Sequence, residues 1–128
     1  MALRVVRLGT PRNKDEGLRV GTVRRPPRGV PKSRFSQDDW YDVWFPNLAP
    51  SVETMKLGQA AVSEADWAAF RRRYKAEMAA PEASHALSLL AALSHSSNFA
   101  VGCYCEDETR CHRSVLRALL AGAGAKFA

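Results

Sequence analysis

The sequence predicts a single three-layer α/β domain with a mixed or mostly parallel sheet of about four strands and helices on both faces. Two observations support this fold class. The chain has 128 residues, 46% of them hydrophobic and 25% charged, a size that supports one buried core. Strand-like and helix-like segments also alternate along the chain, which favours one α/β domain over separate α and β halves. We therefore take residues 1–128 as one domain that carries a basic, proline-rich loop at about 24–39.

The N-terminal third predicts two strands followed by that loop. Residues 3–8 and 18–23 are short apolar runs rich in β-branched side chains, as strands are. Residues 24–34 then hold three prolines, one glycine and five cations, a composition that forbids regular structure. The aromatic run at 40–45 fits either a strand or the start of a helix, and its periodicity does not decide between them.

Two serines mark helix starts in the middle of the chain. Ser51 follows a proline and is predicted to cap a helix rather than to act as a nucleophile. Ser63 begins the clearest helix, which ends before Pro81. Its apolar face is formed by four large side chains at steps of three, four and four residues: Trp67, Phe70, Tyr74 and Met78.

The C-terminal part predicts a helix, a buried strand and a last helix. The helix over residues 82–94 is expected to turn three leucines inward, Leu87, Leu90 and Leu93. Residues 98–104 are an apolar run of the length of a buried strand, and acidic residues make the turn that follows. The last helix begins near Cys111 and ends at Gly122.

Positive charge is concentrated in the first quarter of the chain. The net charge is +6, but residues 1–34 hold ten of the nineteen lysines and arginines and only two acidic residues, a net of +8. Residues 35–128 hold nine cations and eleven acids, a net of −2. Such asymmetry indicates an anionic partner, and nucleic acid is one candidate. The alternative is a solvated loop that only keeps the protein soluble.

Composition also excludes several classes of protein. No apolar run approaches the roughly 18 residues of a membrane span, so we expect no membrane partner. Residues 1–10 contain two arginines and no cleavage site of small residues, so they are expected to form a strand and not a signal peptide. Three cysteines are an odd number, which argues against a secreted disulfide scaffold and favours a reducing cytoplasm.

Residues 103–113 are the densest set of chemically active side chains. They span the predicted end of a strand, a loop and the first turn of a helix, which is where ligands bind in open α/β sheets. A helix start offers free N–H groups to an anion. Arg113 and His112 add a forked donor and a titratable group, and we expect both side chains to be partly exposed. The same position is expected to lower the pKa of Cys111.

Four interpretations of this segment stay open. The segment is an anion site built from Arg113, His112 and backbone amides, or a structural network of buried thiols. It is a catalytic centre with Cys111 as nucleophile and His112 as base, although adjacent residues usually point apart. Or it is a metal site, with four ligands: Cys103, Cys105, Cys111 and His112. Their spacing lacks the two-residue knuckle of zinc sites, so we assign no metal ligand and expect less than one equivalent of zinc or iron.

Several further motifs occur in a characteristic order. They are the loop Arg25-Pro26-Pro27-Arg28-Gly29 with Lys32 after it, Leu48-Ala49-Pro50-Ser51, the Trp67…Phe70…Tyr74…Glu77 helix, and Cys103 before Cys111-His112-Arg113. Together they resemble the bacterial family catalogued as domain of unknown function 488, to which the YeaO-like proteins belong, over nearly the whole chain. The YeaO-like branch has a tryptophan at the position of Pro26 and lacks the Cys-His-Arg motif, so this chain is similar to the branch that carries it. The resemblance implies a small cytosolic α/β domain without an established activity.

The family motifs add candidate site residues from the basic loop. Arg28 and Lys32 would close over the helix start and hold a phosphate or carboxylate. The expected ligand-binding residues are Arg113, Arg28, Lys32, Cys103, Glu106 and Tyr74, and the expected catalytic residues are His112 and Cys111.

The resulting hypothesis is a small protein that binds or acts on a phosphorylated or nucleotide-like ligand near residues 111–113. One alternative is a non-catalytic nucleic-acid-binding module that uses the basic quarter of the chain. The other is a cysteine-based redox or metal protein. The sequence indicates no cofactor and leaves open whether the chain is an enzyme.

Overall fold

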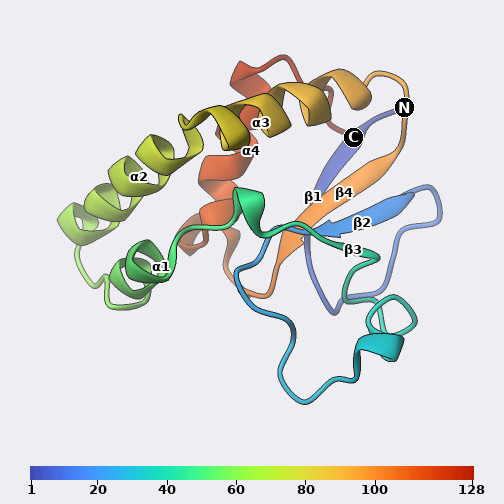
Figure 1. Cartoon of the computed structure of the whole chain (residues 1–128), viewed down its shortest axis with the longest axis horizontal. Helices are drawn as coiled ribbons and strands as arrows, with labels where there is room; N and C mark the ends of the chain where they lie inside the picture. Colours follow the sequence, from blue (N-terminus) through green and yellow to red (C-terminus); the bar gives the residue numbers. More distant parts are fainter.

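The computed structural model describes all 128 residues, and its four strands form one sheet (Figure 1). The strands are β1 (Leu3–Arg7), β2 (Leu18–Gly21), β3 (Val43–Trp44) and β4 (Phe99–Cys103). Their order across the sheet is β1-β4-β2-β3, and every neighbouring pair is parallel. This confirms the expected mostly parallel sheet of four strands and identifies the run at 40–45 as the site of a short strand.

Strand β4 lies in the middle of the sheet, between β1 and β2. All five of its residues are buried, as expected for a strand covered on both faces. Because the strands are parallel, their carboxyl ends at Arg7, Gly21 and Cys103 meet at one edge of the sheet. The loop that carries the densest set of chemically active side chains leaves the sheet from this edge.

The four helices are α1 (Val52–Gln59), α2 (Glu64–Met78), α3 (Pro81–Leu93) and α4 (His112–Gly122). Ser51 caps α1, because its hydroxyl accepts a hydrogen bond from the N–H of Thr54 at 3.2 Å. Ser63 caps α2 in a reciprocal capping box with Asp66. Both predicted helix starts are therefore confirmed. None of the helices has the length and apolar character that crossing a bilayer requires.

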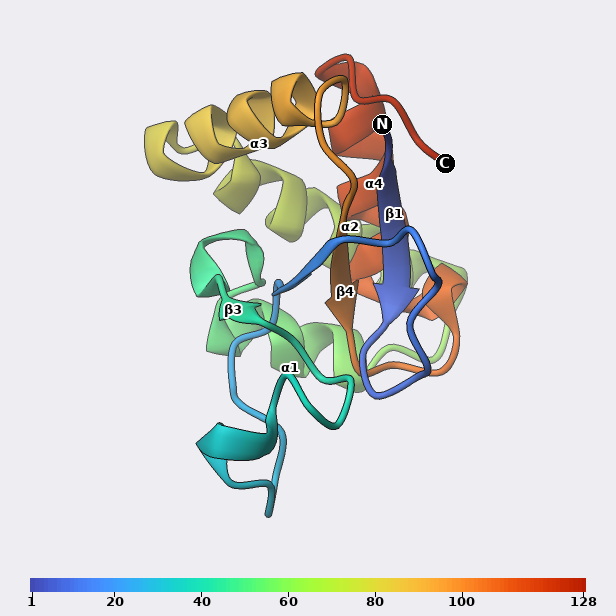
Figure 2. The same ribbon diagram turned by 90° about the vertical axis from the view of Figure 1, so that its right-hand side faces the viewer.

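The helices pack together on one face of the sheet, as the two views show (Figures 1 and 2). The buried core between the two layers takes Leu3, Val20, Phe99 and Val101 from the sheet, and Trp67, Phe70, Tyr74, Met78, Leu87, Val115, Leu116 and Leu120 from the helices. The predicted stripe of α2 is therefore buried. On the opposite face, the ring of Tyr41 packs against Gly21 of β2, and Arg19 of β2 donates to the carbonyls of Thr10 and Asp39. The short 3-10 helix η1 (Lys32–Arg34) has no buried residue and lies beyond the end of the sheet (Figure 2). The third layer of the domain is thus built from loops.

Helix α3 buries a narrower face than the sequence predicts. Leu87 is buried as expected, but Leu90 is only half-buried and Leu93 is 39% exposed. The buried stripe runs instead through Ala83, Leu87 and Ala91, at steps of four residues. Alanine at two of these positions lets α3 approach its neighbours closely, which leaves the larger leucines at the margin of the contact.

Charged side chains of the N-terminal quarter anchor the loop layer. Arg19 and Glu16 form a fully buried ion pair at 2.6 Å, and Arg19 also donates to the carbonyls of Thr10 and Asp39. Arg12 pairs with the carboxylate of Asp39 at 3.1 Å. A buried guanidinium is tolerated only when it is paired and hydrogen-bonded, so these contacts fix the loops over the sheet. Part of the N-terminal positive charge therefore serves the fold.

Candidate functional site

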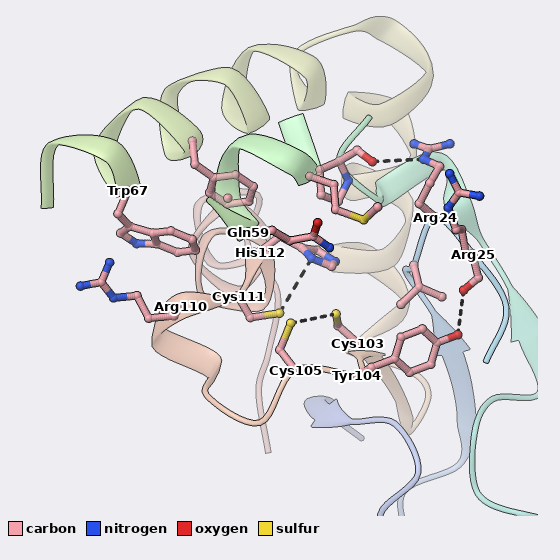
Figure 3. A pocket seen from close by; sticks show the side chains of 15 residues that line it. Arg24, Arg25, Gln59, Trp67, Cys103, Tyr104, Cys105, Arg110, Cys111 and His112 are labelled. Carbon is pink, nitrogen blue, oxygen red and sulfur yellow. Dashed lines mark hydrogen bonds between the residues drawn. The ribbon is translucent and has the colours of Figure 1, made fainter. Parts of the chain in front are cut away.

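A pocket of about 360 Å³ opens at the carboxyl edge of the sheet (Figure 3). The end of β4 and the start of α4 form one side of it, and Met55, Trp67 and Phe70 of α1 and α2 form an apolar wall. Arg24 and Arg25, which follow β2, lie at the far side. We call this space the thiol pocket, because three cysteines line it. It lies at the edge of the sheet where the sequence places the site.

Three sulfur atoms and one imidazole gather in the thiol pocket. The Sγ atoms of Cys103 and Cys105 are 3.8 Å apart. The Sγ atoms of Cys103 and Cys111 and a ring nitrogen of His112 all lie within 4.8 Å of one another, and these three side chains are buried. Cys105 is exposed, and no cysteine is in a disulfide. The strand end, the loop and the helix start each contribute one thiol to this cluster.

Cys111 and His112 are adjacent in sequence, yet their side chains meet. Cys111 is the N-cap of α4 with an extended backbone (φ −129°, ψ 154°), and His112 is the first helical residue. This change of backbone conformation places the Sγ of Cys111 3.8 Å from the Nδ1 of His112. The Nε2 of His112 lies 2.8 Å from the carbonyl oxygen of Thr22. Because a carbonyl can only accept, Nε2 carries the proton and Nδ1 faces the thiol as an acceptor.

Among the three thiols, Cys111 is the one that ionises most readily. Hydrogen bonds from the thiols of Cys103 and Cys105 lower the pKa of Cys111 far below its usual value; burial opposes this and His112 reinforces it. The pKa of Cys103 is raised, because its thiol donates to its neighbours and is buried. The partial positive charge at the start of α4 also lowers the pKa of Cys111. Cys111 is therefore the thiol of the cluster with a lowered pKa, next to two S–H donors.

Arg113 is buried in the first turn of α4 and does not line the thiol pocket. Its guanidinium donates to the carbonyl oxygen of Cys105, and its Nε has no hydrogen-bond partner. The loop before α4 folds back over this turn, because Arg117 pairs with Glu108 at 2.9 Å. Arg113 is 3% exposed and His112 is 7% exposed, so the expectation that both side chains are partly exposed is wrong. Arg113 holds the loop that carries Cys105.

Three other expected ligand-binding residues lie outside the thiol pocket. Arg28 lines a neighbouring hollow, and Lys32 lines a further one beside Tyr41. Glu106 is largely exposed and lies 3.7 Å from Arg7. A sequence does not indicate where a loop with exposed polar side chains will fold. The positions of these three residues could therefore be found only from the structure.

Tyr74 is fully buried behind the site. Its hydroxyl donates to the carbonyl of Leu48 at 2.7 Å, and its ring packs edge-on against His112 with ring centres 5.5 Å apart. Tyr74 therefore supports the imidazole from α2 and does not line the thiol pocket. Of the eight expected site residues, the three that line it are Cys103, Cys111 and His112.

The pocket contains charged and aromatic residues that sequence reasoning did not assign to it. Arg110 lies over the ring of Trp67, 5.8 Å from its centre. Arg25 lines the opposite side, and Gln59 of α1 lies between them. Arg24 is held in place by donating to three backbone carbonyls, those of Pro46, Ala49 and Pro50. For Arg110, the one sequence signal that indicates a place in the pocket is its position directly before Cys111.

Comparison with protein families matches residues 3–124 to the family described as the active DUF488-N3 subclade. The matched residues include all four strands, all four helices and every residue of the thiol cluster. A search of the curated proteins and a search of the solved structures gave no match. The family match therefore covers the sheet, the pocket at its carboxyl edge and the ordered motifs from Arg25 to Arg113 together. On this ground the chain belongs to the DUF488 family, as a member of its active N3 subclade.

Proposed function

We propose that this protein is a cytoplasmic enzyme that uses the Cys111 thiolate as a nucleophile on a phosphorylated or nucleotide-like substrate. One observation carries the proposal: the Sγ of Cys111 lies 3.8 Å from Nδ1 of His112, at a helix start that opens into a pocket. The thiolate is the nucleophilic form of cysteine, and an adjacent imidazole and a helix N-terminus both stabilise it. A reducing compartment keeps such a thiol free.

The charges around the pocket suit an anionic substrate. Arg25 and Arg110 line it and have no carboxylate partner within the chain. Guanidinium groups bind phosphate or carboxylate by two parallel hydrogen bonds, so either arginine fits an anion near Cys111. The apolar wall of the pocket, which includes Met55, suits a nonpolar part of the substrate beside that anion.

The chemistry that follows is group transfer through a covalent intermediate. The Cys111 sulfur donates an electron pair to an electrophilic carbon or phosphorus atom of the substrate, and the bond from that atom to its leaving group breaks. The leaving group takes the proton that Nδ1 of His112 received from Cys111. Water then attacks the covalent intermediate and gives one proton to His112. The bond to the Cys111 sulfur breaks, which releases the product and restores the thiolate.

Titration of the thiolate by its ultraviolet absorbance tests the proposal without a known substrate. We expect one thiolate of the wild type to titrate well below about pH 8.5, the usual pKa of cysteine, and Cys111→Ser to lose this titration. Cys105→Ser is the matched control, because its hydroxyl still donates to Cys111 and should leave a low-pKa thiolate in place. His112→Gln should raise the pKa of Cys111. A wild type whose thiolates all appear above about pH 8.5 would contradict the proposal.

A metal centre in the same cluster is the second candidate function, and the spacing of the sulfur atoms favours it. In a tetrahedral site with zinc–sulfur bonds of about 2.3 Å, neighbouring sulfur atoms lie about 3.8 Å apart. The Sγ atoms of Cys103 and Cys105 have this separation. The contact from Nε2 of His112 to a backbone carbonyl is also typical of a zinc-bound histidine.

Elemental analysis of the protein purified without added metal separates the two candidates. The thiolate proposal expects less than one equivalent of zinc or iron and a Cys111 titration that a chelator leaves unchanged. One equivalent of zinc per chain, with unfolding or release of free thiols on chelation, would overturn it in favour of the metal centre.

A further inference from the structure

A second hollow, of about 590 Å³, lies beside the thiol pocket. Three of the ten residues that line it are arginines, Arg7, Arg25 and Arg28, and none is acidic. We call it the arginine hollow. Arg25 and Tyr104 line both spaces, so the arginine hollow and the thiol pocket adjoin at these two residues.

The boundary between the two spaces is held in a defined position. The hydroxyl of Tyr104 donates to the backbone carbonyl of Arg25 at 2.8 Å, which ties the basic loop to the loop after β4 (Figure 3). Pro26 and Pro27 follow directly and fix two successive φ angles. The guanidinium groups on either side of this tie are therefore presented from a restrained backbone.

Two of the three arginines in the arginine hollow, Arg25 and Arg28, have no partner within the chain. Neither Arg25 nor Arg28 has a side-chain hydrogen bond or a carboxylate partner within the chain. Other arginines of the basic quarter pair with carboxylates, including Arg7 of the hollow itself, which lies 3.7 Å from Glu106. The others are Arg12, Arg19 and Arg34. Arg25 and Arg28 are thus available to an anionic ligand at the arginine hollow.

Aromatic side chains alternate with these cations. The rings of Trp40 and Tyr104 both line the arginine hollow and pack edge-on, with centres 5.8 Å apart. Gly9 adopts a positive φ of 90°, and a Cβ there would lie 2.8 Å from the Trp40 ring, so glycine makes room for the indole. Aromatic rings interspersed with arginines are the arrangement on which nucleic-acid bases stack while their phosphates are neutralised.

We infer that the substrate of this enzyme is a strand of single-stranded nucleic acid that spans both spaces. This inference rests on the proposed function for the chemistry in the thiol pocket. One nucleotide enters the thiol pocket, and its neighbours place their phosphates on Arg25 and Arg28 and a base against Trp40. A mononucleotide would leave the arginine hollow unused, and a duplex would keep its bases paired and away from Trp40.

Fluorescence anisotropy with a labelled single-stranded DNA of about 12 nucleotides tests the inference. We expect wild-type protein to bind it at about 50 mM salt and to release it at about 200 mM salt. Arg25→Ala/Arg28→Ala should weaken binding at least tenfold and reduce the slope of log K against log salt by about 1.4, about 0.7 for each lost phosphate contact. The matched control is Arg72→Ala/Lys75→Ala on the exposed face of α2, which removes the same charge and should change affinity less than twofold.

Several outcomes would overturn the inference. These are no binding at low salt, equal weakening by the two double variants, or a mononucleotide that binds as tightly as the strand. If the protein binds the strand but has no thiolate of low pKa, the proposed enzyme is refuted and the inference of a strand-binding surface stands. If it has a thiolate of low pKa but does not bind the strand, this inference alone is refuted.

Discussion

Replacing Glu16 by glutamine tests the buried ion pair that anchors the loop layer. Glu16 and Arg19 are each 1% exposed and are joined by hydrogen bonds of 2.6 and 3.0 Å. Glutamine keeps the shape of glutamate but removes its charge, so the guanidinium stays buried without a carboxylate. Breaking a buried pair in this way costs about 3–5 kcal/mol. Arg19 keeps its bonds to the carbonyls of Thr10 and Asp39, so we expect the lower end, about 3 kcal/mol.

Urea denaturation followed by tryptophan fluorescence measures this loss, which corresponds to a decrease in Tm of about 10 °C for a chain of this size. Glu64→Gln is the matched control, because Glu64 is 73% exposed and pairs with Arg71 at 3.2 Å. Exposed pairs contribute little to stability, so the control should unfold like the wild type. If Glu16→Gln is no less stable than Glu64→Gln, the reasoning about the buried pair is refuted.

The same variant has a pH signature. Burial raises the pKa of Glu16, but hydrogen bonds from Arg19 and Asn13 lower it by more than burial raises it. The pKa of Glu16 therefore lies below its usual value. A carboxyl with a lowered pKa contributes stability above its unfolded pKa and loses it as the pH falls through the folded value. Below about pH 4.3, the unfolded pKa of glutamate, the wild type should lose this contribution and Glu16→Gln should lose less stability. Identical acid unfolding of the two proteins would contradict the assignment.

Three further predictions concern the site and its support. Leu116→Ala should lower the free energy of unfolding by about 2–5 kcal/mol in urea, because Leu116 is fully buried in the core, and should leave the Cys111 titration unchanged. Tyr74→Phe should cost about 1–2 kcal/mol through the lost bond to the Leu48 carbonyl. Tyr41→Phe is its control: the Tyr41 hydroxyl is buried without a partner, so its removal should not destabilise the protein, and an equal loss in both variants would refute this account. Arg113→Ala should speed amide hydrogen exchange in residues 104–110 and leave residues 64–78 unchanged, since Arg113 holds the Cys105 carbonyl. Unchanged exchange in 104–110 would show that Arg113 does not position this loop.

The sequence by itself predicted several local elements and the edge of the sheet at which the thiol pocket lies. The caps at Ser51 and Ser63 and the buried stripe of α2 depend on side chains a few residues apart, so near neighbours suffice to specify them. The apolar run at Phe99–Cys103 identified the central strand for the same reason. A parallel sheet then places the residues after that strand at its carboxyl edge, which is where the thiol pocket lies.

Only the tertiary structure decided which of these residues are buried, paired or brought together. Arg19 and Arg25 look alike in the sequence, but Glu16 neutralises the first while no carboxylate lies near the second. Arg113 is covered because the preceding loop folds back onto α4, a contact that no local pattern encodes. The three thiols meet because a strand end, a loop and a helix start converge. Even where the partner is close in sequence, as Glu16 is to Arg19 and Glu108 to Arg117, the backbone path that brings the two side chains together is set only when the chain has folded.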